Sequence, residues 1–232
     1  MRVHITRLLM SMLCIGATST SIHAATPTIV EAFNSNAAGF NVYNDALQFG
    51  WNATLGNPGG CITAVDDVSG VIWGFQAGSA FLGDKSCYAG GTLSFDMYVN
   101  ITGGAGLSEP DIYLIGGGLT LAYDVPTPVN SATWTTRSAV LSPGSGWRLN
   151  NQNGALATQA NFDTVLANLT AIRFRIEYRS GSDNGRLDNV VLAPAAIDPC
   201  GCDDIDFNNN GVFPEDLDVA DYLSVLAGAE CP

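Results

Sequence analysis

The 232-residue chain contains very little histidine and few basic residues. Its two histidines, His4 and His23, both lie in the first 25 residues, and it carries 9 Lys and Arg against 22 Asp and Glu. Without histidine, the rest of the chain lacks the usual serine or cysteine triad and most zinc sites. The shortage of basic residues argues against nucleic acid and anionic membranes as partners, because both attract positive surfaces.

The chain also lacks a long apolar run after its first residues. Residues 1–25 begin with Arg2 and Arg7, continue with a short apolar run and end in small residues at Ala24 and Ala25. This pattern is typical of a secretory signal peptide, and its apolar part is about half the length of a membrane span. We therefore expect a secreted, extracellular protein with no membrane span. It keeps 7 basic and 22 acidic residues, a net charge near −15.

Five cysteines remain after Cys14 is removed with the signal peptide. Export permits disulfides. We expect one disulfide between Cys61 and Cys87 and a second that joins Cys231 to Cys202 or Cys200, which leaves one thiol over.

Glycine is abundant, with 26 residues, and Gly, Pro, Asn and Asp separate short segments of alternating polarity. In "AIRFRIEYR", for example, Phe174 and Ile176 alternate with Arg175 and Glu177, which predicts a strand with one buried and one wet face. The other expected strands are "TPTIVEAF", "GVIWGFQAG", "GTLSFDMYVNI", "DIYLIGGGLTLAYDV", "ATWTTRSAVL" and "RLDNVVLAP". Many short strands of this kind are typical of an all-β jelly-roll β-sandwich, which we place at residues 26–193.

Two segments differ from this pattern. "TQANFDTVLANLT" has apolar residues at helical spacing and predicts one short helix, capped by Thr158 or Asn161. After a linker at 194–202, residues 203–232 form an acidic segment, which we expect to be a calcium loop followed by a helix.

The tail fits the calcium-loop pattern in its first half. Calcium loops place oxygen ligands at positions 1, 3, 5, 7, 9 and 12, with glycine at position 6. With Asp206 at position 1, the next ligands are Asn208, Asn210 and the carbonyl of Val212, and Gly211 takes position 6. Leu217 stands where the last carboxylate belongs, so we expect Asp216 or Asp218 to replace it. A solvated acidic turn is the alternative interpretation.

The larger part of the chain resembles the laminin B domain, also called laminin domain IV. The resemblance rests on "GNPGGCITAVDDVSGVIWGFQAGSAFLGDKS", "GGTLSFDMYV", "LIGGGLTLAYD" and "RIEYRSGSDNGRLDNVVL", and it covers about Glu31 to Leu192. It implies a jelly roll akin to carbohydrate-binding modules, without catalytic residues. The tail is loosely similar to half a dockerin; because dockerins pair two loops, we do not expect a cohesin partner.

The resemblance also implies a second cation site, because such jelly rolls often hold a structural calcium where the first and last strands meet. By position, Glu31 and Asp188 would be its ligands. The alternative is that both are ordinary strand-end acids, with Asp188 supporting the turn after "SDNG". Ca²⁺ is the only cofactor we expect.

Trp147, beside a turn in "PGSGWRLN", is the candidate for an exposed surface on which sugar rings stack, whereas Trp73 belongs to the core. The sequence thus favours a secreted, non-catalytic structural or adhesion module whose partner is a matrix or cell-surface protein. A carbohydrate-binding protein, with a polysaccharide partner, is the alternative. A glycoside hydrolase using acids such as Asp66, Asp67, Asp96 and Glu177 is weaker, because two acids in a β protein are expected by chance.

Overall fold

The computed structural model describes residues 26–67, 70–101, 103–181, 183–196 and 216–227. Residues 26–196 belong to one compact unit of the chain, and 216–227 belong to a second. None of the helices in these ranges is both long and apolar enough to cross a bilayer.

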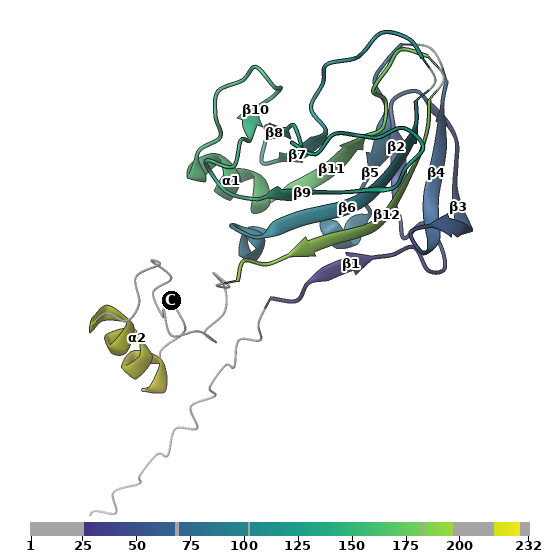
Figure 1. The fold of residues 1–232 in the computed structure, drawn as a ribbon. Helices are drawn as coiled ribbons and strands as arrows, with labels where there is room; N and C mark the ends of the chain where they lie inside the picture. The colour runs from purple at the N-terminus through teal and green to yellow at the C-terminus, as the bar shows by residue number, and fades with distance from the viewer. Residues whose placement is uncertain (1–25, 68–69, 102, 182, 197–215, 228–232) are drawn as a thin grey trace, which may run out of the picture. The chain divides into compact units, whose positions relative to one another are not determined.

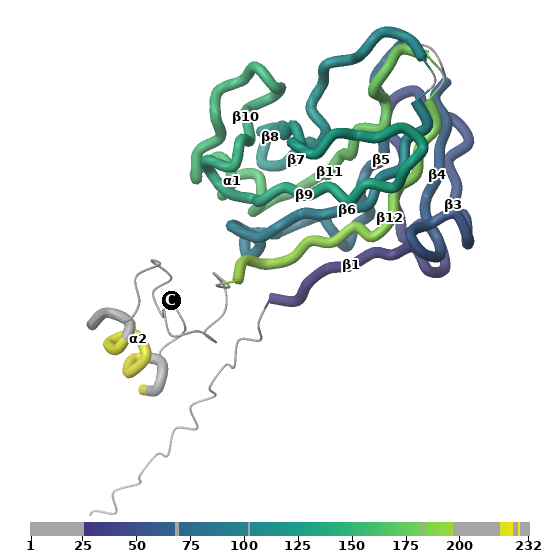
Figure 2. Tube along the Cα trace, viewed as in Figure 1, coloured from purple at the N-terminus to yellow at the C-terminus, as the bar shows by residue number. Residues whose placement is uncertain are grey.

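The larger unit is built from two antiparallel sheets (Figure 1). Sheet A has the order β3 (Ala46–Gly56), β4 (Gly59–Asp66), β12 (Asn184–Ala193), β6 (Thr92–Asn100), β9 (Thr135–Val140), and β1 (Ile29–Glu31) pairs with β12. Sheet B has the order β10 (Arg148–Leu149), β8 (Leu119–Tyr123), β7 (Ile112–Gly116), β11 (Leu169–Arg175), β5 (Gly74–Gln76), β2 (Asn41–Tyr43). In the Cα trace β12 runs between β1 and β6 (Figure 2). The predicted all-β jelly-roll sandwich is confirmed.

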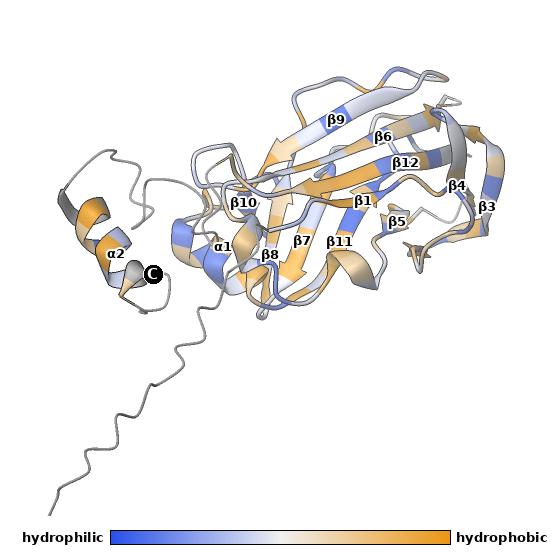
Figure 3. Cartoon of the chain, turned by 90° about the horizontal axis from the view of Figure 1, so that it is seen from below, coloured by the Kyte–Doolittle hydropathy of each residue, from blue (hydrophilic) through white to orange (hydrophobic). Residues whose placement is uncertain are grey.

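One aromatic core lies between the sheets. The ring of Phe95 on β6 packs edge-on against that of Phe174 on β11, with centroids 4.8 Å apart, so the contact joins the two sheets. Both residues are fully buried, and so is Trp73, as expected. Hydrophobic residues dominate β7 and the C-terminal half of β12, as Figure 3 shows, because these segments turn a face toward this core. Such aromatic pairs add about 0.5–1.5 kcal/mol beyond the burial of area.

The predicted short helix is α1 (Gln159–Leu166), and its start is specified locally. The amide of Asn161 donates to Oγ1 of Thr158, and the amide of Thr158 donates to Oδ1 of Asn161, which is a capping box. Phe162, Val165 and Leu166 form its buried face. The helix expected in the tail also forms, as α2 (Asp216–Leu226).

Two features of the sandwich differ from expectation. The long hairpin of β3 and β4 was not predicted, because β3 is half or fully exposed along its whole length and its register with β4 shifts twice. The prediction that the polar residues of β11 face water is wrong for Arg175 and for Glu177, which follows the strand. They are only 5% and 3% exposed.

Candidate functional site

The two acids expected to bind calcium in the sandwich come from paired strands. β1 pairs with β12, with Glu31 opposite Val190, and Asp188 lies two residues earlier on β12, opposite Asp96 of β6. Asp188 is 0% exposed and lies in the middle of β12, so it is not a strand-end acid. The structure therefore brings the two predicted ligands into one region and adds Asp96 to it.

A bulge in β12 and the turn of the β3–β4 hairpin enclose Asp188. The register of β12 against β6 shifts after Asp188, and Asn189 takes a left-handed φ of 48°. The amide of Asn57, in the turn, donates to Asp188 Oδ2 at 2.6 Å, and the amide of Asn189 donates to Oδ1 at 2.7 Å. A Cβ on Gly56 would lie 2.1 Å from the carbonyl oxygen of Gly60. Only glycine at position 56 therefore allows the turn to lie this close to Asp188.

Asparagine side chains tie the same turn to Asp96. Nδ2 of Asn189 donates to Asp96 Oδ2 at 2.8 Å and to the carbonyl of Asn57 at 2.6 Å, and Nδ2 of Asn57 donates to Asp96 Oδ2 at 3.1 Å. The hydroxyl of Thr136 donates to the other oxygen of Asp96 at 2.6 Å. The bulge and the turn thus form one hydrogen-bonded unit around two carboxylates.

This region concentrates negative charge. Burial raises the pKa of Asp188 above its usual range, and the charges of Asp96 and Glu31 raise it further, against the effect of its two amide donors. Glu31 itself accepts the amide of Phe33 at 2.6 Å. Neither Glu31 nor Asp188 forms an ion pair with any described residue. Within the described ranges, no group of three or more His, Cys, Asp or Glu side chains is arranged to hold a metal ion.

The predicted Cys61–Cys87 disulfide is wrong. Cys61 is a free, fully buried thiol in β4, whereas Cys87 lies in a 3₁₀ turn at Ser86–Tyr88 and is disulfide-bonded. The prediction was based on both cysteines lying in the large domain, but Cys61 is buried in β4 without a partner sulfur. Burial raises the pKa of the Cys61 thiol to about 11, so it stays protonated and unreactive at neutral pH. Cys202 and Cys231 lie outside the described residues.

Trp147 is not an exposed surface for sugars. It is 1% exposed, stacks on Tyr123 at 4.9 Å and meets Phe162 edge-on at 6.0 Å. Its indole nitrogen donates to the carbonyl of Val140 at 2.8 Å. The prediction fails because the ring closes the core beside α1 rather than projecting from the turn.

The aromatic pair that does reach the surface is Tyr98 with Trp134, and it was missed. Both are half-buried, and their ring centroids lie 5.8 Å apart. Tyr98 alternates with the core residues Phe95, Met97 and Val99 of β6, so it points to the outer face of sheet A. The guanidinium of Arg186 lies over the Tyr98 ring at 4.4 Å. The alternation in "TLSFDMYVN" could have identified this surface.

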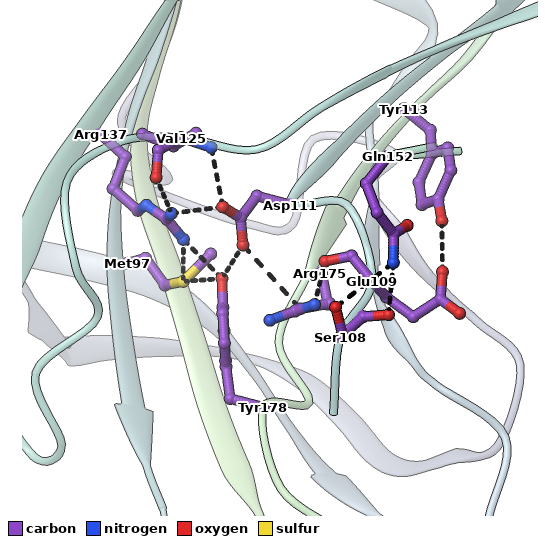
Figure 4. A network of polar contacts seen from close by, with 10 residues as sticks. All are labelled: Met97, Ser108, Glu109, Asp111, Tyr113, Val125, Arg137, Gln152, Arg175 and Tyr178. Carbon is purple, nitrogen blue, oxygen red and sulfur yellow. Dashed lines mark hydrogen bonds and ion pairs between the residues drawn. The ribbon is translucent and has the colours of Figure 1, made fainter. Parts of the chain in front are cut away.

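The loops before β7 and after β8 close over a buried polar network (Figure 4). Asp111 accepts from Arg137 Nη2 at 2.6 Å, from the amide of Val125 at 2.8 Å and from the Tyr178 hydroxyl at 2.7 Å. Oδ1 of Asp111, which accepts from Tyr178, also lies 3.8 Å from Nε of Arg175. The guanidinium of Arg175 stacks on the Tyr178 ring at 4.0 Å. Burial and the charge of Asp111 raise the pKa of Tyr178, so it remains a hydroxyl donor.

A cavity of about 340 Å³ opens above this network. Its wall includes Ser108, Glu109, Asp124 and Thr127 besides the two arginines, so donors and acceptors face it together. Burial raises the pKa of Asp124, and the neighbouring Asp111 raises it further. These groups can hydrogen-bond a hydroxylated molecule, but no described histidine or reactive thiol accompanies them.

The tail calcium loop was also predicted from the sequence. Asp206, Asn208, Asn210 and Val212 lie outside the described residues, and Asp216 is the first residue of α2.

The two antiparallel sheets with one aromatic core define a jelly-roll β-sandwich. The chain matches the family model Laminin B (Domain IV) over residues 74–201, and it belongs to that family. Among solved structures, the L4b domain of human laminin alpha-2 is similar, with a TM-score of 0.50, 16% identity and coverage of 57% of this chain and 80% of that one.

Two further solved structures are less similar. The family 11 carbohydrate-binding module of the cellulase Lic26A-Cel5E of Clostridium thermocellum has a TM-score of 0.48 at 17% identity, covering 74% of this chain and 97% of that one. The cellulose induced protein Cip1 has a TM-score of 0.42 at 11% identity, covering 75% and 99%. No curated protein sequence gives a significant match.

Proposed function

We propose that this protein is a secreted, non-catalytic extracellular module whose sandwich is stabilised by calcium. Membership in the Laminin B (Domain IV) family and the rigid two-sheet fold support a structural or adhesive role toward a matrix or cell-surface protein. The acidic composition and the signal-like first residues support export.

The observation that carries the calcium proposal is the carboxylate of Asp188. It is fully buried, its strongest charged neighbours are the acids Asp96 and Glu31, and it has no basic partner among the described residues. Two of its lone pairs accept amides, which leaves others for a metal ion. Calcium accepts irregular sets of carboxylate and carbonyl oxygens, so Glu31 and Asp188 fit it as ligands from two paired strands.

We extend the proposal to the tail, where α2 begins at Asp216, shortly after the sequence segment that carries the expected ligands Asp206, Asn208, Asn210 and Val212. A helix after the ligand loop is the arrangement that the calcium pattern requires. With a single loop of this kind, a cohesin partner is not part of the proposal.

Thermal unfolding of the full chain with excess Ca²⁺ and with chelator tests both sites. A ligand at 100 times its Kd adds about 2.7 kcal/mol, or roughly 5–11 °C for a domain of this size. Asp188→Asn should remove the sandwich part of the shift, and Asp206→Ala the tail part. Asp163→Asn, which neutralises an exposed acid of α1, should leave the shift intact. A midpoint that is the same in Ca²⁺ and chelator would refute calcium stabilisation.

Carbohydrate binding is the second candidate, favoured by the surface pair Tyr98 and Trp134. Two aromatic rings beside the Arg186 guanidinium offer a stacking face and hydrogen-bond donors to a polysaccharide. Affinity electrophoresis through gels containing plant or microbial polysaccharides tests it. Trp134→Ala should weaken any retardation about tenfold, whereas Val140→Ala, at an exposed position of β9, the strand that begins directly after Trp134, should not. Equal retardation of all three proteins would exclude this surface.

A further inference from the structure

A second acidic region lies apart from Asp188, around a cavity of about 150 Å³. Asp66, at the end of β4, and Glu177, just after β11, line this cavity, and Ile72 and Leu107 contribute apolar wall. The amide of Asp66 donates to the carbonyl of Asp183 at 2.9 Å, and Asp66 pairs across the hairpin with Ala46, next to Asp45. The fold thus gathers four acids from three parts of the chain.

Glu177 is buried in this region, and one of its carboxylate oxygens has no hydrogen-bond partner. It is 3% exposed, it forms no ion pair with any described residue, and its Oε2 has no hydrogen-bond partner. A buried carboxylate normally has its oxygens occupied by donors, because an unpaired charge in an apolar environment is strongly unfavourable. An oxygen left in this state beside a cavity therefore points to a ligand that donates or carries positive charge.

The strongest charges around Glu177 are negative, so no basic side chain among the described residues serves as its main counterion. Burial, followed by the charges of the acids Asp66, Asp45 and Asp183, raises its pKa from 4.5 to about 7, against the effect of a hydrogen bond with the Trp73 backbone. The nearby Arg179 is exposed and donates to the carbonyl of Gly104. When the cavity holds no cation, a proton on Glu177 therefore limits the repulsion between Glu177 and these acids.

We propose that this cavity binds a divalent cation, Ca²⁺ being the best match, through the carboxylates of Asp66 and Glu177. The remaining ligands are backbone carbonyls and water, and Asp45 and Asp183 act through their field. The lining has no histidine or cysteine, so hard, oxygen-preferring ions are favoured. Ca²⁺ tolerates an irregular set of oxygens better than Mg²⁺. A water occupies about 30 Å³ of liquid, so the cavity has room for an ion and a few waters.

A site with two carboxylate ligands is consistent with the finding that no group of three or more His, Cys, Asp or Glu side chains in the described residues is arranged to hold a metal ion. The cation and the proton compete for Glu177, so binding should strengthen as pH rises past 7. The site is separate from the calcium sites proposed above, because none of its residues belongs to them.

Calorimetric titration of the full chain with Ca²⁺ at pH 8 tests the inference. Asp188→Asn and Asp206→Ala are introduced first, so that the proposed calcium sites do not contribute. In this background Glu177→Gln and Asp66→Asn should each abolish one binding site, and Asp163→Asn should keep it. Glu177→Gln should also melt at a higher temperature than its parent in chelator, because it removes a buried charge without changing shape.

Either of two results would overturn the inference: a background protein that binds no Ca²⁺, or equal binding by the parent, Glu177→Gln and Asp66→Asn. Glu177→Gln and Asp66→Asn are measured separately. If one of them does not fold, Ca²⁺ binding by the other still tests the inference. The calcium proposal for Asp188 fails separately, when Asp188→Asn does not change the shift of the otherwise native chain.

Discussion

Asp111 and Glu177 are both acids buried in one sandwich, and their neighbours give them opposite properties. Asp111 accepts from Arg137 and Tyr178 and lies beside Arg175, so its negative charge is balanced where it is buried. Glu177 has acids as its strongest charged neighbours and one oxygen without a donor. A buried acid whose charge is balanced by basic neighbours is typical of a structural role. A buried acid without such neighbours indicates a group that exchanges a proton or an ion.

Glu177 should make stability fall with rising pH when divalent cations are removed. Its folded pKa, about 7, lies above the ordinary 4.5, so the folded state keeps a proton that the unfolded state loses in between. The stabilisation is complete below pH 4.5 and is lost as pH rises to about 7. Urea midpoints measured in chelator across this window should decline less in Glu177→Gln than in the native chain. Parallel curves would show that Glu177 does not titrate in the window.

The turn of the β3–β4 hairpin closes the Asp188 region, and Gly56 allows the turn to lie close to Asp188. A Cβ at Gly56 would overlap the Gly60 carbonyl and come within 2.7 Å of Asp188 Oδ2, so Gly56→Ala should destabilise by about 1–3 kcal/mol. Gly50→Ala on the same strand is the matched control, because nothing lies within 4 Å of its added Cβ. Urea unfolding of both variants gives the comparison. Equal midpoints would mean that the turn relaxes freely.

Elements with a strong local period were predictable from the sequence, and the elements around the sites were not. α1 carries its own cap and apolar face, and β6 and β12 alternate clearly enough to place Phe95 and Leu187 inside. β3 has no such period, so the turn that holds Asp188 through Asn57 was not foreseen. Glu31 and Asp188 were predicted by position from the family resemblance, whereas the place of Asp96 beside them needed the register of three strands.

Burial of polar side chains by loops escaped prediction for a related reason. Alternation along β11 indicates which face Arg175 occupies, but not that the loop before β7 covers it. Trp147 shows the same limit, because its burial depends on Tyr123 and α1 rather than on its own turn. Contacts between distant segments carry this information, and a single sequence does not show them.

At the scale of the whole molecule, the two sheets share one core, so they should unfold together. Trp147 reports on the sheet B side through Tyr123, and Trp51 on β3 reports on sheet A through its bond to the Phe33 carbonyl. In each variant that keeps one of these tryptophans, the urea midpoint from fluorescence should equal the midpoint from far-ultraviolet circular dichroism, because both sheets lose their structure in one transition. Two separate midpoints would show that the sheets are independent.

Phe95→Ala should then lower the free energy of unfolding by about 3–5 kcal/mol. Both urea midpoints should therefore fall together. The ring is fully buried, and its contact with Phe174 is the aromatic bridge between β6 and β11, so its loss leaves a cavity between the sheets. Val140→Ala, an exposed apolar truncation on sheet A, should change stability by no more than about 0.5 kcal/mol. If only the Trp51 signal moved in Phe95→Ala, sheet A would carry its own stability. The structural role proposed for this protein would then rest on one sheet rather than on the sandwich.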